Sequence, residues 1–448
     1  MVVFLSFGCG IEDFHHSAAG AGFTAFGRMF LLIFALLCDI IIELFYMRCF
    51  MFILKKIWCR AFQIAFRLAL PLLPYREPKV LSSCSELPGL LKEKKVSSVL
   101  VVTDAGIVRN GLTGTLEMAL ADGNIEYTVY DKTQPNPTVD NVEEAYKIYC
   151  KKGCSALIAI GGGSAMDCAK AVGARVAYPG RAVGKMAGVL RVLRPLPTLI
   201  AIPTTAGTGS ETTLAAVITD SREHHKYALM SFPLIPHYAV LDATLTYTLP
   251  PHLTSTTGMD ALTHAVEAYI GRSTTKQTEA LAIEAVKLVF ENIELAYADG
   301  KNHVARENML HAAYKAGVAF SKSYVGYIHA IAHSLGGKYG TPHGLANAVI
   351  MPYVLDLYGD AVYEKLYRLG VAAGVCKESD GCEKGAKSFI SAIRELNRKM
   401  GIPEKINGIL SDDIPLLARH AEREANPLYP VPVLMTAEEL EKVYINIS

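Results

Sequence analysis

Between residues 96 and 203 the chain alternates short β-branched runs with helical patterns and glycine-rich turns. The runs predict strands over Val96–Thr103, Ile125–Tyr130, Ala156–Ile160 and Thr198–Ile202. Apolar runs of this length are typical of strands buried on both faces of a parallel sheet. A helix is predicted over 139–152. The pattern therefore predicts an open, largely parallel α/β sheet, in which ligands bind beyond the carboxyl ends of the strands.

The character of the chain changes at Leu249-Pro-Pro251. Long helical patterns follow, for example over 279–298, 305–320 and 361–373, and strand patterns disappear. A chain of 448 residues is long enough for two cores. We therefore predict an α/β domain over 76–249 and an all-helical domain over 250–448.

The first seventy-five residues stand apart from both domains. We treat 1–46 as an apolar extension that the native protein need not contain, because Met47 and Met51 are alternative starts. Asp39 and Glu43 interrupt its apolar run, which is also too short to span a bilayer. Residues 47–75 predict an amphipathic helical segment. It either lies at a membrane interface or docks on the rest of the protein, and we favour docking.

The net charge and the spacing of the cysteines limit the functions that this protein can have. The net charge is +1 with acids and bases intermixed, which excludes a nucleic-acid footprint. The ten cysteines form no CxxC pair, and Cys150 and Cys154 have no second pair to complete a zinc site. We expect reduced thiols and a cytoplasmic protein.

Two glycine-rich segments follow predicted strands. Gly161-Gly-Gly-Ser164 leads into a helix, whose free N–H groups and dipole can hold a phosphate. It matches neither GxGxxG nor a Walker A loop, so a plain turn is the alternative. The second segment carries hydroxyls and includes Thr208-Gly-Ser-Glu211, which also fits a helix-capping box. Its hydroxyls belong to Thr204, Thr205, Thr208 and Ser210.

Asp104 ends the first predicted strand. A carboxylate there can accept the two ribose hydroxyls of an adenosine and repels a 2′-phosphate. It precedes the glycine loop, the reverse of the usual dinucleotide fingerprint, and a helix-capping role is equally compatible with its position.

Nitrogen and oxygen donors recur at helical spacing in the second half of the chain. His329 and His333 are four residues apart, His343 follows, and Asp260 and His264 repeat the spacing. Side chains four apart lie on one helix face. Such donors suit Fe²⁺ or Zn²⁺ and not Ca²⁺. From spacing alone, His333 groups with His329.

Together these segments resemble the iron-containing (group III) alcohol dehydrogenases, from about Arg76 to the carboxyl end. The resemblance is carried by VVTD ending at Asp104, PNPT, GGGSAMD, PTTAGTGSE, TGMDALTHAVEAY and HAIAHSLGGKYGTPHGLANAV. Ala165 stands where many relatives have proline, which we expect to matter little. The resemblance implies an α/β dinucleotide domain followed by a helical metal domain, as in dehydroquinate synthase-like folds.

The resemblance also implies roles for individual residues. It gives the metal to Asp260, His264, His329 and His343, and leaves His333 near the nicotinamide as a proton-transfer residue. It places the pyrophosphate on Gly162, Gly163 and Ser164. The remaining cofactor residues would be Thr204, Thr205, Thr208 and Lys226 in the cleft, Asn136 near the ribose, and Asp104 selecting NAD over NADP.

The expected enzyme is an NAD-dependent dehydrogenase with Fe²⁺, or alternatively Zn²⁺, that interconverts a small primary alcohol or diol and its aldehyde by direct hydride transfer. The alternatives on this fold are glycerol dehydrogenase-like, hydroxy-acid (4-hydroxybutyrate-type) and dehydroquinate synthase-like enzymes. A non-catalytic, membrane-associated nucleotide-binding protein is the alternative of another class. We expect a homodimer or larger assembly without nucleic-acid partners, and membrane attachment through the first residues is left open.

Overall fold

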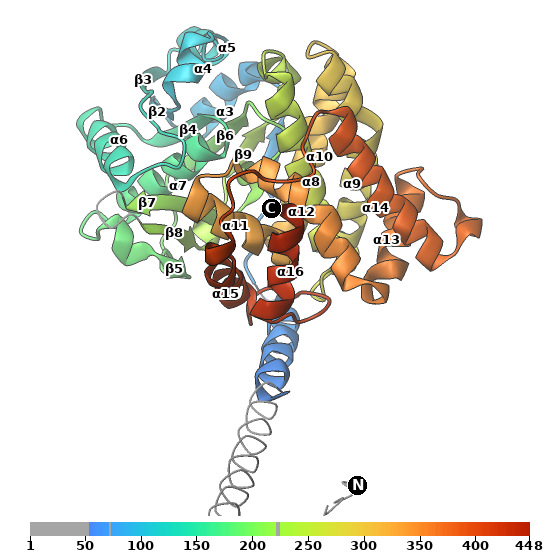
Figure 1. The fold of residues 1–448 in the computed structure, drawn as a ribbon. Coiled ribbons are helices and arrows are strands. Elements are labelled where there is room, and N and C mark those ends of the chain that lie inside the picture. Colours follow the sequence, from blue (N-terminus) through green and yellow to red (C-terminus); the bar gives the residue numbers. More distant parts are fainter. Residues whose placement is uncertain (1–52, 71–72, 221–224) are drawn as a thin grey trace, which may run out of the picture. The chain divides into compact units, whose positions relative to one another are not determined.

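The structure is a computed structural model that describes residues 53–70, 73–220 and 225–448 (Figure 1). By internal contacts the chain divides into units 1–60 and 61–448. The predicted extension 1–46 lies outside the described residues. The second unit contains both the sheet and the helices that follow it, so the boundary at 249/250 stays a prediction. Among the described helices, none has the length and apolarity needed to cross a membrane.

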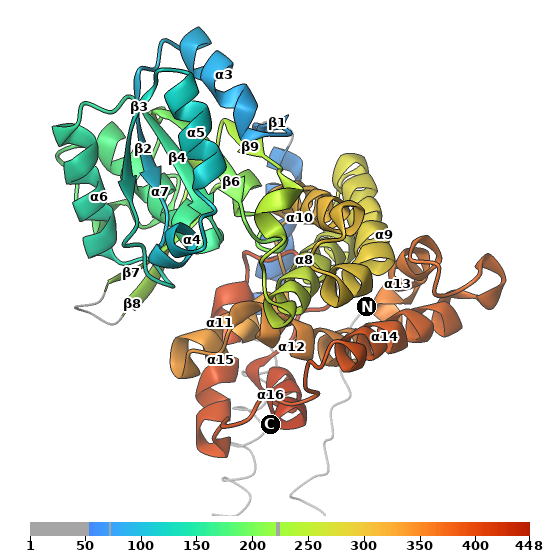
Figure 2. The same ribbon diagram turned by 90° about the horizontal axis from the view of Figure 1, so that it is seen from above.

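Six parallel strands form the main sheet, in the order β1-β9-β6-β4-β2-β3 (Figure 2). Their bounds are β1 (Lys79–Leu81), β2 (Ser98–Val102), β3 (Glu126–Tyr130), β4 (Ala156–Gly161), β6 (Thr198–Pro203) and β9 (Tyr238–Val240). The four predicted strands are β2, β3, β4 and β6. The two edge-side strands β1 and β9 were not predicted, because three residues are too few to show a pattern.

The alternation of side chains along β4 explains why the sheet needs helices on both faces. Leu157 and Ala159 lie in one core with α6 (Val139–Lys151) and α7 (Gly163–Ala177). Ile158 and Ile160 lie in a second core with α3 (Leu87–Glu93) and α5 (Gly114–Asp122). Successive side chains of a strand point to opposite faces, so a run without polar residues is buried on both.

A smaller sheet, which was not predicted, has the order β5-β8-β7. Its strands are β5 (Gly188–Val189), β7 (Ala215–Asp220) and β8 (His225–Met230), and β7 and β8 are antiparallel. It places Lys226 on β8, within reach of the loop before α6.

After β9 the chain is helical, as predicted. The helices are α8 (Pro251–Ile270), α9 (Lys276–Ala298), α10 (His303–Ser323), α11 (Tyr327–Tyr339), α12 (His343–Tyr358), α13 (Asp360–Ala372), α14 (Cys382–Lys399), α15 (Ile414–Ala425) and α16 (Ala437–Ile447). Helix α8 packs against α9, α10 and α12, while α11 packs against α12 and α15. Every residue of α8 from 258 to 270 is buried.

The segment predicted as amphipathic is helical over 53–69. In the second unit, the Gln63 amide donates to the carbonyl of Tyr429 at 2.7 Å. The Phe66 ring meets the Tyr324 ring edge-on, with centroids 5.1 Å apart. These two contacts favour the docking interpretation for this half of the helix.

Candidate metal centre and phosphate-binding loops

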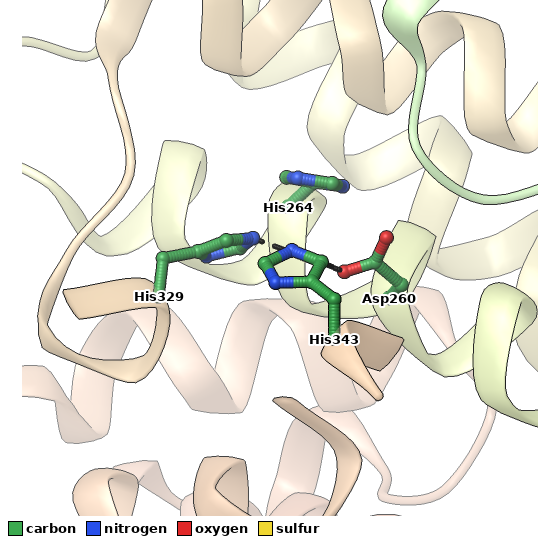
Figure 3. Close-up of side chains that lie close together, drawn as sticks. All are labelled: Asp260, His264, His329 and His343. Carbon is green, nitrogen blue, oxygen red and sulfur yellow. Dashed lines mark ion pairs between the residues drawn. The ribbon is translucent and has the colours of Figure 1, made fainter. Parts of the chain in front are cut away.

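Three helices bring four predicted ligands together (Figure 3). Asp260 and His264 are one turn apart on α8, His329 comes from α11, and His343 is the first residue of α12. One donor atom from each lies within 4.8 Å of the other three. His333, which spacing alone grouped with His329, is not in this cluster. The four residues are those that the resemblance implied as ligands.

Two ring nitrogens of the clustered residues lack a hydrogen-bond partner. His264 Nδ1 and His329 Nε2 are buried without a hydrogen bond. Asp260 Oδ1 lies 3.9 Å from His329 Nε2 and 3.5 Å from His343 Nε2. A buried polar atom without a partner costs about 1–3 kcal/mol. These atoms therefore fit a divalent ion, and three nitrogens with one oxygen suit Fe²⁺ or Zn²⁺.

Electrostatics keep the imidazoles neutral, as metal ligation requires. Burial and the surrounding imidazoles lower the pKa of His329 well below its ordinary value. Burial also lowers the pKa of His264, against the opposing effect of Asp260. Desolvation lowers the pKa of His343 to about 4. Neutral rings leave a lone pair for the ion.

Two residues that contact the candidate ligands were not predicted from the sequence. The Glu267 carboxylate lies 2.6 Å from Nδ1 of His329, and the Asn347 amide donates to Asp260 Oδ1 at 2.7 Å. Spacing could have revealed Glu267, because it follows Asp260 by seven residues and His264 by three, on the same helix face. Asn347 carries no comparable signal.

His333 lies at the edge of the cluster. Its side chain is 43% exposed, and its ring stacks on that of His343 with centroids 5.2 Å apart. Nδ1 lies 2.6 Å from the Glu424 carboxylate, which also accepts from the Tyr429 hydroxyl at 2.8 Å. Partial burial lowers the pKa of His333, but the carboxylate of Glu424 outweighs it and raises the pKa. No local pattern in the sequence marks Glu424.

The first glycine loop has the geometry of a phosphate site. Gly162 is the residue before α7, and no side chain caps the free N–H groups of the helix. Ser164 Oγ accepts from the backbone N–H of Asn136 at 3.4 Å, and the Lys226 ammonium donates to the Asn136 amide oxygen at 3.0 Å. Three segments far apart in sequence therefore meet at the helix N-terminus, where an anion is favoured.

The hydroxyl-rich segment after β6 lies against the same loop. Thr204 donates its backbone N–H to the carbonyl of Gly161 at 3.0 Å. A Cβ added to Gly162 would lie 3.7 Å from Thr205 Oγ1, and one added to Gly163 would lie 3.2 Å from Thr208 Cγ2. The loop and the hydroxyls thus form one surface at the carboxyl ends of β4 and β6.

The capping-box interpretation of Thr208–Glu211 is wrong. The short 3₁₀ helix there begins after Gly209, which has φ +59° and no side-chain cap. Ser210 Oγ instead donates to Asp167 and accepts from the buried Lys170 ammonium, both at 2.9 Å. These bonds tie the segment to α7, while Gly209 lies so close to α10 that an added Cβ would be 2.7 Å from the Gly317 Cα.

Asp104 combines both interpretations of its position. Its Oδ1 accepts the N–H groups of Gly106 and Ile107 at 2.8 and 3.1 Å, so it caps α4 (Ala105–Arg109). Its Oδ2 lies beside the glycine loop, 3.7 Å from where a Gly161 Cβ would be. The capping role is present in the structure, and selection of NAD stays a prediction.

Comparison with known proteins decides the family. Residues 81–243 match the family model described as iron-containing alcohol dehydrogenase, and residues 254–447 match the carboxyl-terminal model of the same family. The chain belongs to the iron-containing alcohol dehydrogenase family. It is therefore an oxidoreductase that acts on alcohols, and iron and NAD are the cofactors of its family.

Individual members of the iron-containing alcohol dehydrogenase family are similar over most of their length. Alcohol dehydrogenase 4 of Saccharomyces cerevisiae is 37% identical, over 79% of this chain and 92% of that protein. The NAD-dependent methanol dehydrogenase of Bacillus methanolicus is 38% identical, over 75% and 88%. A crystal structure of a 1,3-propanediol oxidoreductase superposes with a TM-score of 0.80 at 33% identity, covering 84% of this chain and 99% of the other.

Proposed function

We propose that this protein interconverts a small primary alcohol or diol and its aldehyde, with NAD as the hydride carrier and Fe²⁺ held by Asp260, His264, His329 and His343. The supporting observation is the convergence of four donor atoms within 4.8 Å. Two buried imidazole nitrogens there have no other partner. The relatives that act on methanol and 1,3-propanediol support a small substrate.

The ligand set defines the chemistry available. A divalent ion bound there would supply a Lewis acid that stabilises an alkoxide and polarises a carbonyl. One carboxylate and three neutral imidazoles would leave the site with a net charge of about +1, which favours a negative oxygen. Because Asp260 and His329 are each 2% exposed, little water can screen this charge.

The loops at the carboxyl ends of β4 and β6 would hold NAD. The free N–H groups of Gly163 and Ser164 at the start of α7 suit the pyrophosphate. Thr204, Thr205, Thr208 and Lys226 would line the cleft, with Asn136 and Asp104 near the adenosine ribose. The bonds that join Asn136, Ser164 and Lys226 support one continuous binding surface.

His333 would handle the proton that the hydroxyl releases. Its ring stacks on His343, which belongs to the cluster, and its Nδ1 contacts the carboxylate of the partly exposed Glu424. Glu424 orients the ring and stabilises its protonated form, and solvent reaches both residues. General acid–base groups contribute typically 10²–10⁴-fold to rate.

The protein is further inferred to act in the cytoplasm as a homodimer or larger assembly. The described cysteines are free thiols, in keeping with a reducing compartment. Sedimentation of the full chain and fractionation of cells that express it test these two inferences.

The function is tested by removing and restoring the metal. Protein treated with a chelator is reloaded anaerobically with Fe²⁺ or Zn²⁺ and assayed for NADH formation with short primary alcohols, diols, glycerol and hydroxy acids. We expect no turnover without metal and the fastest turnover with Fe²⁺ and a small primary alcohol or diol. Preference for glycerol or a hydroxy acid would favour the alternative enzymes, and full activity without metal would contradict the proposal.

A histidine outside the cluster provides a control for the histidine variants of the metal site. His303 is exposed at the start of α10 and contacts the Tyr247 hydroxyl, away from the cluster. His303→Ala should keep its metal content and its turnover.

A further inference from the structure

Glu267 is a buried carboxylate that the reaction described above does not use. It is 3% exposed and belongs to the stretch of α8 that is buried on all sides. The other carboxylate and the imidazole of that stretch, Asp260 and His264, are candidate ligands. Burying a carboxylate costs several kcal/mol unless it is paired or hydrogen-bonded. Glu267 must therefore have partners that stabilise it.

Its partners are three nitrogen atoms at one end of α11. Oε2 accepts the backbone N–H of Gly326 at 2.8 Å and lies 2.6 Å from Nδ1 of His329. Oε1 accepts the backbone N–H of Ile328 at 2.8 Å. Burial raises the pKa of Glu267 to about 8, while the surrounding N–H groups favour its ionised form. When the carboxylate is ionised it can only accept hydrogen bonds, and the His329 proton then lies on Nδ1. The lone pair of that ring is then on Nε2, which faces Asp260 and has no other partner.

The backbone of the segment that begins α11 holds both oxygens of the carboxylate. Gly326 precedes α11, and a Cβ there would lie 2.7 Å from Glu267 Oε1. The two backbone bonds fix both oxygens, so the direction of the third bond, to His329, is fixed as well. Because α8 also carries Asp260 and His264, one helix supplies two candidate ligands and the anchor of a third.

We propose that Glu267 is a positioning residue that sets the tautomer and orientation of His329 and thereby the affinity of the cluster for a divalent metal. This inference rests on the proposed function, since it needs His329 to be a ligand. Carboxylates that hold the second nitrogen of a ligating histidine typically change metal affinity by about 10–100-fold when they are replaced.

Glu267→Gln is the sharpest variant, because it keeps the size and removes one acceptor oxygen. If the amide NH₂ faces His329, Nδ1 must accept a hydrogen bond and the ring proton moves to Nε2, where it blocks ligation. If the NH₂ faces Ile328, two N–H groups oppose each other and the contact opens. Either orientation weakens the site.

The full-length protein, freed of metal, is titrated with Fe²⁺, Zn²⁺ and Co²⁺ against a competing chelator. We expect the dissociation constants of Glu267→Gln to rise by about 10–100-fold. The absorption spectrum of the Co²⁺ form should also change, because one imidazole is misplaced. Thr263→Val is the control: this buried neighbour bonds to Met259 and Met351 and should bind metal like the wild type.

The outcomes separate this inference from the proposed function. If the metal affinity and the Co²⁺ spectrum of Glu267→Gln are unchanged, Glu267 serves only to cap α11. The inference is then wrong, but the proposed function is unaffected. If wild type and His329→Ala bind metal equally poorly, the proposed function fails with it. Should Glu267→Gln not fold, Gly326→Ala keeps the carboxylate but displaces it, and must show the same loss of affinity.

Discussion

The candidate metal cluster and the candidate phosphate-binding loops are built in opposite ways. The cluster uses side chains that project from α8, α11 and α12, and Glu267 and Asn347 hold His329 and Asp260 in place. The loops use backbone N–H groups at strand ends, shaped by glycines and short hydroxyl side chains. Identity of the side chain therefore matters most in the cluster, while the path of the backbone matters most in the loops.

Loss of one ligand should give the largest effect and separate the two regions. His343→Ala removes a donor and should abolish both metal content and turnover, a loss of about 10³-fold or more if the Lewis acid supplies several kcal/mol. Binding of NADH, measured by fluorescence, should persist, because the loops do not depend on the cluster. If NADH binding is lost together with the metal, the loops depend on the cluster and the two regions are not independent.

His333→Ala tests whether His333 lies outside the metal cluster. The variant should keep its metal, because His333 lies outside the group of four donors. Its kcat should fall by roughly 10²-fold or more, since a general acid–base group is lost. Metal content by elemental analysis and steady-state kinetics decide the result, and loss of the metal would make His333 a ligand.

Asp104 is the position at which the loops do depend on a side chain. Asp104→Gly should lower the ratio of kcat/KM for NAD to that for NADP by roughly tenfold, because charged hydrogen bonds contribute about 1.5–3 kcal/mol. Asp104→Asn is the matched variant, since its oxygen can still cap α4 while the charge is gone. If only the glycine variant changes the ratio, the cap and not the charge is responsible. A wild type that already prefers NADP would refute the role.

The smallest expected effect concerns stability on the sheet side. His237 Nδ1 accepts the N–H of Leu199 at 3.1 Å, and burial, with Arg76 nearby, lowers its pKa to about 4. The unfolded chain takes up this proton first as the pH falls, so the stabilisation is full above about pH 6.5 and lost by about pH 4. The full linkage is about 3 kcal/mol, and solvent screening at this half-buried ring reduces the loss to about 2 kcal/mol.

Denaturant unfolding of metal-loaded protein measures that loss. In His237→Asn, whose side-chain oxygen can accept the same bond, the stability should depend less on pH between 4 and 6.5 than in the wild type. Parallel curves for the two proteins would show that His237 is not the group that titrates.

Local patterns in the sequence predicted the central strands and the group of candidate donors that includes His333. Strand β4 is apolar on both faces, and Asp260 and His264 are one turn apart. Resemblance, not spacing, separated His343 from His333. The residues that hold the ligands could not be read in this way, since Glu267 and His329 are 62 residues apart and Glu424 and His333 are 91 apart. Such pairs exist only once the helices have packed.

Asp104 and the segment after β6 show a second limit. Both helix capping and ribose binding are compatible with the same local sequence, and the structure shows the cap through Oδ1 while Oδ2 points toward the loop. The short strands β1, β9 and β5 are defined by their neighbours in the sheet, not by their own residues.

The close approach of Gly209 to Gly317 has a mechanical consequence. The segment after β6 is tied to α7 through Ser210 and rests on α10 with no space for even a methyl group. An alanine at either glycine would therefore push the segment after β6 away from α10. Enzyme engineers who wish to widen the substrate space should therefore leave Gly209 and Gly317 unchanged and alter other residues.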